Sequence, residues 1–130
     1  MILDSSAIVA ILLREPACER LLAQLEQRPL LAVGAPTLFE AALVLSARIR
    51  SDARPLMAAF LRDAAIEVIP FTHEHYEVAL DAFLRYGKGR HPAALNLGDC
   101  LSYAVARLSG LPLLYTGDDF SKTDLAAPQG

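Results

Sequence analysis

Met1-Ile-Leu-Asp-Ser-Ser-Ala7 opens the chain and predicts a short apolar strand that ends at a carboxylate and leads directly into a helix. Ser5 and Ser6 are good N-caps for this helix, which we expect over residues 7–13, although Asp4 could itself be the capping residue. Strand, acid and helix start therefore follow one another without a loop. In open α/β sheets, ligands bind at the edge where the carboxyl ends of the strands lie, and Asp4 is expected at such a strand end.

The same alternation of strand and helix continues along the chain. Strands that alternate with helices indicate a parallel sheet covered by helices on both faces. We therefore predict a single domain over residues 1–130, a three-layer α/β/α sandwich with a central parallel sheet. Further strands are expected over residues 30–33, 67–70 and 113–115, and further helices over residues 16–27, 37–50, 55–65, 72–86 and 97–109.

Composition and charge limit the possible functions. The 130 residues carry a formal net charge of −3, so no bulk attraction to nucleic acid or to an anionic membrane is expected. The longest stretch without a charged side chain, residues 29–39, is well short of the roughly 20 residues of a membrane helix. Cys18 and Cys100 stand apart from other cysteines, which argues against a disulfide scaffold or a zinc site. We expect a cytoplasmic protein.

Four acids are the candidate site residues. Asp4 and Asp118 follow predicted strands, and Asp99 lies in the first turn of a predicted helix. Glu40 is expected on an apolar helix stripe with Leu43 and Val44, where an unpaired carboxylate would be costly. Taken singly, each acid also has an ordinary structural explanation, as a helix cap, a turn former or a surface side chain.

Together, the four acids can converge on one rim of the sheet. Two like charges about 4 Å apart repel by roughly 4 kcal/mol at an effective dielectric constant near 20, so such a cluster needs protons or cations. Oxygen ligands alone favour Mg²⁺ or Mn²⁺. Without these four acids, eleven acids would face twelve bases, a formal charge near +1. Binding of a phosphate backbone by the rest of the surface is then plausible.

Several motifs along nearly the whole chain resemble those of PIN-domain ribonucleases, and most closely the VapC-type toxins of bacterial toxin–antitoxin pairs. They are Met1-Ile-Leu-Asp-Ser-Ser-Ala7, Pro36-Thr-Leu-Phe-Glu40, Leu95-Asn-Leu-Gly-Asp-Cys100 and Leu114-Tyr-Thr-Gly-Asp-Asp-Phe120, with Thr123-Asp124 behind them. The third motif is highly specific, whereas the first would be weak alone.

The resemblance assigns roles to individual residues. The family's catalytic, metal-binding acids fall on Asp4, Glu40, Asp99 and Asp118, although the adjacent Asp119 could take the fourth place. Ser6 and Thr116 fall where family members orient these acids by hydrogen bonds.

The activity that the resemblance implies is metal-dependent hydrolysis of RNA phosphodiester bonds, with Mg²⁺ or Mn²⁺ as cofactor and 5′-phosphate and 3′-hydroxyl product ends. A PIN fold kept only for binding, as an inert scaffold subunit, is the alternative. A magnesium-binding receiver module is disfavoured because the strand before Pro70 and Phe71 ends without an acid.

A basic loop precedes the helix that carries Asp99. Lys88, Arg90 and His91 of this loop, with Arg85 at the end of the preceding predicted helix, are candidates for binding the RNA backbone, and a solvated loop without function is the alternative.

The partners follow from the resemblance. VapC-type toxins pair with a small antitoxin that covers the acidic cleft and binds operator DNA, and they form homodimers. This chain has no recognisable DNA-reading element of its own. Apolar helices around residues 21–25 and 56–61 could supply surface for either contact.

Overall fold

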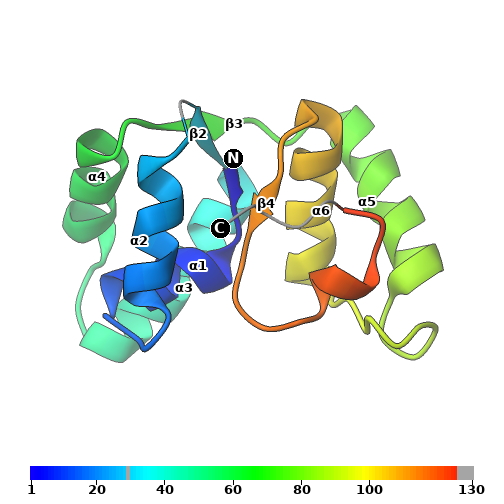
Figure 1. The fold of residues 1–130 in the computed structure, drawn as a ribbon, viewed down its shortest axis with the longest axis horizontal. Helices are drawn as coiled ribbons and strands as arrows, with labels where there is room; N and C mark the ends of the chain where they lie inside the picture. Colours follow the sequence, from blue (N-terminus) through cyan, green and yellow to red (C-terminus); the bar gives the residue numbers. More distant parts are fainter. Residues whose placement is uncertain (29, 126–130) are drawn as a thin grey trace.

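Strand β1 (Ile2–Leu3) lies inside a parallel sheet of strand order β3-β2-β1-β4 in the computed structural model, which describes residues 1–28 and 30–125 (Figure 1). The register pairs Ile2 with Ala32 and Leu113, and Leu3 with Leu114. All strands of this sheet run in the same direction, so their carboxyl ends meet at one edge. The other strands are β2 (Leu31–Gly34), β3 (Ile66–Ile69) and β4 (Leu113–Leu114).

Helices cover both faces of the sheet. Their bounds are α1 (Ser5–Leu12), α2 (Cys18–Glu26), α3 (Ala35–Ile49), α4 (Arg54–Asp63), α5 (His73–Tyr86) and α6 (Leu97–Ser109), and a short 3₁₀ turn, η1, spans Phe120–Lys122. The first four helices pack on one face, and α5 and α6 cover the other with η1 (Figure 1). This arrangement confirms the predicted α/β/α sandwich with a central parallel sheet.

Successive side chains of the central strands belong to the two different layers of the core. Leu3 and Leu114 point into the layer of α1 to α4, whereas their neighbours Ile2 and Leu113 point into the layer of α5 and α6. All four side chains are fully buried, because successive residues of a strand face opposite sides of a sheet. The central strands are therefore anchored from both sides, and the positions of their carboxyl ends are fixed.

Most predicted elements agree with the structure to within a few residues. The helix after β1 begins at Ser5, two residues earlier than expected, because the side chain of Asp4 is its N-cap and accepts a hydrogen bond from the Ser6 amide. Within the described residues, none of the helices is long and apolar enough to cross a bilayer.

Candidate functional site

Asp4 lies at the point where β1 ends and α1 begins, and it is only 4% exposed. Its Oδ2 accepts hydrogen bonds from the Ser6 amide at 3.1 Å and from the Ser6 hydroxyl at 2.6 Å. The Ser6 hydroxyl in turn accepts from the Thr116 amide at 3.1 Å, so the loop after β4 is tied to the same point. Ser6 thus fixes the orientation of Asp4, while Thr116 contributes through its backbone.

A buried hydroxyl pair connects Asp4 to two helices. The Ser102 hydroxyl of α6 donates to Asp4 Oδ1 at 2.5 Å and lies 3.3 Å from the Thr37 hydroxyl of α3. Both side chains are almost completely buried. Thr37 precedes Glu40 by one helical turn, and Ser102 follows Asp99 by one turn. The pair therefore sets where the two helices place their acids.

Sequence reasoning missed both hydroxyl residues. The available signal was a polar side chain one helical turn away from a candidate acid, on the inner face of an otherwise apolar helix. Buried hydroxyls need hydrogen-bond partners, so such a position points to a polar network.

The surroundings of Glu40 differ from the prediction. The expected apolar stripe is wrong, because Leu43 is 55% exposed and Val44 is 40% exposed, whereas α3 buries Thr37, Ala41 and Leu45. Glu40 is half-buried at the flank of this inner face. Its Oε1 atom is buried and has no hydrogen-bond partner among the described residues. Such an unused acceptor is costly unless a donor or a cation reaches it.

Gly98 makes room for the carboxylate of Glu40. A Cβ atom at this position would lie 2.8 Å from Glu40 Cδ and closer still to Oε2. Gly98 belongs to the first turn of α6, immediately before Asp99. The missing side chain is thus what lets an acid of α3 approach the start of α6, and sequence reasoning assigned no role to it.

Asp99 belongs to a capping box at the start of α6. The Asn96 amide donates to Asp99 Oδ2 at 3.1 Å, and the Asp99 amide donates to Asn96 Oδ1 at 2.9 Å. Burial and, to a lesser extent, the charges of Asp4, Asp119 and Glu40 raise the pKa of Asp99 to about 6, against the lowering effect of the Asn96 hydrogen bond. The acids from β1, α3 and α6 therefore lie near enough to repel one another.

We expect Asp99→Asn to stabilise the metal-free protein at neutral pH. A carboxyl whose pKa is raised on folding destabilises the folded state increasingly from its unfolded-state pKa up to its folded-state pKa, so the advantage of the variant should grow between about pH 4 and pH 6 and then level off. On the order of 1 kcal/mol is expected after allowance for solvent screening of this half-buried group. Urea unfolding in chelator across this pH range measures the difference. Asp81→Asn, at an exposed carboxylate on α5, is the control, and equal pH profiles for the two variants would contradict the expectation.

The fourth acid was predicted at Asp118, with Asp119 as the alternative. Asp118 is largely exposed, and its Oδ2 lies 4.0 Å from Lys122 Nζ. Asp119, not Asp118, is among the charges that act on Asp99. Of these two acids, Asp119 is thus the one whose charge reaches Asp99, which favours it for the fourth place.

The donor chemistry of these side chains suits a hard divalent cation. Asp4, Glu40, Asp99 and Asp119 offer only carboxylate oxygens, and one of these, Glu40 Oε1, is an unpaired buried acceptor. Among the described residues, no three Asp, Glu, His or Cys side chains lie close enough together to hold one ion in their present rotamers. Binding would therefore require the carboxylates to draw together.

The four side chains predicted to bind RNA differ in the partners that they have within the protein. Arg85 donates to the Tyr86 hydroxyl at 2.9 Å and lies 3.6 Å from Asp124, so it has structural partners. His91 Nδ1 accepts from the Ala93 amide at 3.0 Å. Lys88 and Arg90 are exposed in the loop that leads into the first turn of α6, and the Arg90 guanidinium lies over the Phe83 ring, 5.5 Å from its centroid.

Comparisons with known proteins give a consistent result. A model of the PIN domain family matches residues 1–125. Ribonuclease VapC30 of Mycobacterium tuberculosis is 40% identical over 126 residues, which cover 97% of this chain and 96% of that protein. Ribonuclease VapC36 of the same organism is 44% identical over 126 residues, covering 96% of this chain and 91% of the relative.

Two solved structures share the fold at low sequence identity. The crystal structure of Mycobacterium tuberculosis VapC20, a sarcin-ricin loop cleaving toxin, has a TM-score of 0.77 and 22% identity, and covers 96% of this chain and 95% of that chain. A toxin–antitoxin complex from Klebsiella pneumoniae has a TM-score of 0.71 and 19% identity, and the match covers 98% of this chain and 97% of that chain.

Proposed function

Since this chain belongs to the PIN domain family, we propose that it is a metal-dependent endoribonuclease of the VapC type, the toxin of a toxin–antitoxin pair. The observation that carries the proposal is that two acids from other parts of the chain lie against the start of α6, which carries Asp99: Asp4 through the Ser102 hydroxyl, and Glu40 against Gly98 with its Oε1 left as an unused buried acceptor. The relatives named as VapC ribonucleases cover nearly the whole chain. An RNA substrate would place its action in the cytoplasm.

Each acid has a distinct part in this proposal. Asp4, oriented by Ser6 and Ser102, and Asp99, oriented by Asn96, would supply carboxylate oxygens to a Mg²⁺ or Mn²⁺ ion once the acids draw together around it. Glu40 and Asp119 complete the site. When bound, such an ion activates water as the nucleophile and neutralises charge that develops on the phosphate. No side-chain nucleophile is required, because the protein supplies orientation and negative charge for the ion.

Incubation of the purified chain with structured cellular RNA tests the proposal. We expect cleavage with Mg²⁺ or Mn²⁺ and none with chelator, and the cut sites would identify the RNA target. Absence of cleavage by a folded, metal-binding chain across the RNA pool would instead favour a PIN fold kept for binding.

We expect Lys88→Ala combined with Arg90→Ala to weaken RNA binding without changing the fold, because both side chains are exposed. Loss of two phosphate contacts should reduce the slope of log affinity against log salt by about 1 to 2. Filter binding of uncleaved RNA in chelator, across a salt series, measures this slope. Arg20→Ala combined with Arg62→Ala, on α2 and α4, is the control. Equal slopes for the two double variants would contradict a role of the basic loop in RNA binding.

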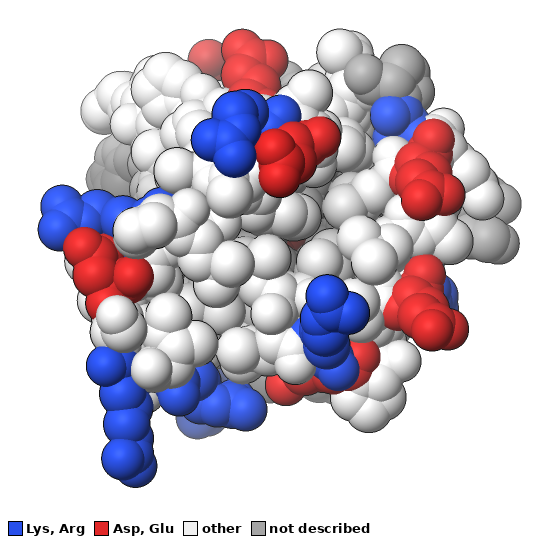
Figure 2. All heavy atoms as spheres, turned by 90° about the vertical axis from the view of Figure 1, so that its left-hand side faces the viewer, with Lys and Arg blue, Asp and Glu red and all other residues white. Residues whose placement is uncertain are grey.

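The proposed antitoxin contact lies on α2 and α4. An apolar groove of about 490 Å³ runs between these helices, with Leu22, Leu25, Leu56 and Phe60 in its lining. Figure 2 shows this side of the molecule, where an uncharged central surface is flanked by Lys, Arg, Asp and Glu side chains. An apolar partner segment with charged flanks would fit such a surface.

A homodimer is the second proposed assembly. Large apolar side chains are exposed on α3, where Phe39 is 64% exposed, and separately on α5 and at the start of α6, where Leu84 is 50% and Leu97 78% exposed. Exposed apolar patches of this kind typically mark contact surfaces. A light-scattering mass equal to one chain would contradict the dimer.

A further inference from the structure

The segment after β4 returns along α6, and we call residues 119–125 the C-terminal strap. Its first anchor is Phe120, which is 3% exposed and whose ring lies 5.1 Å from that of Tyr115. Asp119 directly precedes this anchor. The apolar contact alone fixes one point of the strap and leaves its direction along the helix open.

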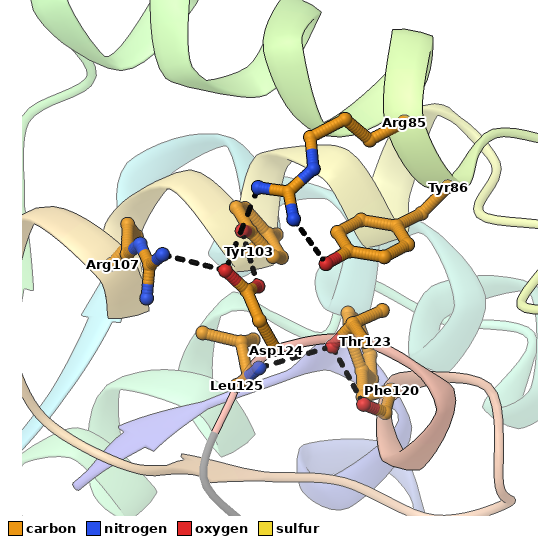
Figure 3. Close-up of polar contacts among 8 residues, drawn as sticks. All are labelled: Arg85, Tyr86, Tyr103, Arg107, Phe120, Thr123, Asp124 and Leu125. Atoms are coloured by element: carbon orange, nitrogen blue, oxygen red, sulfur yellow. Dashed lines mark hydrogen bonds and ion pairs between the residues drawn. The ribbon is translucent and has the colours of Figure 1, made fainter.

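The second anchor is Asp124 (Figure 3). Its Oδ1 accepts from the Tyr103 hydroxyl at 2.6 Å, and its Oδ2 accepts from Arg107 at 2.5 Å and lies 3.6 Å from Arg85 Nη1. Partial burial raises the pKa of Asp124, but the Tyr103 hydrogen bond and the charges of Arg107 and Arg85 outweigh it and hold this pKa below its usual value. The carboxylate therefore stays ionised at neutral pH. It ties the strap to α6 by two charge-assisted hydrogen bonds.

Short-range hydrogen bonds hold the two anchors at a fixed spacing. The Thr123 hydroxyl and the Thr123 amide both donate to the Phe120 carbonyl, at 2.7 and 3.1 Å. The Leu125 amide donates to the Thr123 hydroxyl at 3.3 Å. A shift of Asp124 along α6 would therefore be transmitted to Phe120 and to the residue before it.

The partners of Asp124 share a helix face with a candidate metal ligand. Asp99, Tyr103 and Arg107 follow one another at intervals of four residues, so they lie along one face of α6. The strap runs along this face, with Asp124 at Tyr103 and Arg107. At the other end of the strap, Phe120 is buried in the same core layer as Cys100, so the residues before them, Asp119 and Asp99, belong to the same end of α6, and the charge of Asp119 acts on Asp99.

We infer that Asp124 is a positioning residue, which sets the register of the C-terminal strap on α6 and thereby holds Asp119 beside Asp99. This inference rests on the proposed metal site and adds a residue outside it. Asp124 itself lies beside Arg107 and Tyr103 and supplies no ligand.

The test is Mn²⁺ affinity, measured by titration calorimetry on the full RNA-free chain. Asp124→Asn should reduce the affinity about tenfold, as is typical when a group that orients a metal ligand is lost. In the Asp119→Asn background, the same substitution should cause no further loss, because the strap acts only through Asp119. Arg107→Gln should reproduce the effect, and Arg107→Lys should retain most of the affinity.

Asp52→Asn is the matched control, since Asp52 also pairs with an arginine, Arg54, in another part of the chain. If Asp124→Asn and Arg107→Gln both leave the Mn²⁺ affinity unchanged, Asp124 has no positioning role. The same holds if Asp124→Asn lowers the affinity as much in the Asp119→Asn background as in the wild type. Either result would leave the proposed metal site itself unaffected. A wild-type chain that binds no Mn²⁺, or an Asp99→Asn chain that binds it equally well, would overturn the proposed function and the inference together. Arg107 lies at the surface, so its variants keep the test decisive if Asp124→Asn fails to fold.

Discussion

Substitution of Asp4 and Asp99 by asparagine together should abolish RNA cleavage, with a loss of about 100-fold or more. The two residues present the best-oriented carboxylates of the site, and their amides would offer neither the charge nor the same affinity for a hard cation. The measurement is the initial rate of cleavage of one RNA with Mn²⁺, for wild type and variant at equal concentration.

The double variant should remain folded. Asparagine is as good an N-cap as aspartate, so the start of α1 is retained, and removal of Asp99 relieves a repulsive cluster. Asp52→Asn combined with Asp63→Asn removes the same formal charge from exposed ion pairs and serves as control. If the control lost activity to the same degree, or the site variant kept it, the assignment of the acids would be wrong.

Gly98→Ala should separate stability from metal binding. Alanine in place of a helical glycine ordinarily stabilises a protein by about 0.5–1 kcal/mol. Here the new Cβ would meet the end of the Glu40 side chain, which can swing away at low cost. We therefore expect unchanged or higher thermal stability, together with about a tenfold loss of Mn²⁺ affinity.

Leu97→Ala is the control for Gly98→Ala, since it changes the neighbouring, exposed position of the same helical turn. In a Glu40→Ala background, Gly98→Ala should leave the remaining affinity unchanged. A drop in thermal stability without any change in metal affinity would show that Gly98 serves packing alone.

The fold follows from features that are local in sequence. These features are short-range patterns: apolar strands, the capping box around Asn96 at the start of α6, and Gly110 immediately after its end. Helix α6 begins and ends as expected, at Leu97 and Ser109. The rotation of α3 was not predictable in this way. This helix carries apolar side chains all around, from Phe39 to Val44, so its periodicity does not say which face is buried.

The site was accessible from sequence only in part. The places of Asp4 and Asp99 in the fold could be predicted, because the end of a strand and the first turn of a helix determine their positions. The hydroxyl pair of Thr37 and Ser102 depends on a contact between residues 65 positions apart, which no local pattern encodes. The choice between Asp118 and Asp119 likewise depends on how the strap lies against α6.

The ends of the RNA products test the central claim most directly. In the proposed reaction, a divalent cation held by the four acids would activate water for attack on the phosphodiester bond, and no side chain would act as nucleophile. Structured RNA incubated with the chain and Mn²⁺ should give discrete fragments with 5′-phosphate and 3′-hydroxyl ends, and chelator should prevent their formation. Fragments with cyclic phosphate ends, or cleavage that persists in chelator, would contradict hydrolysis by metal-activated water.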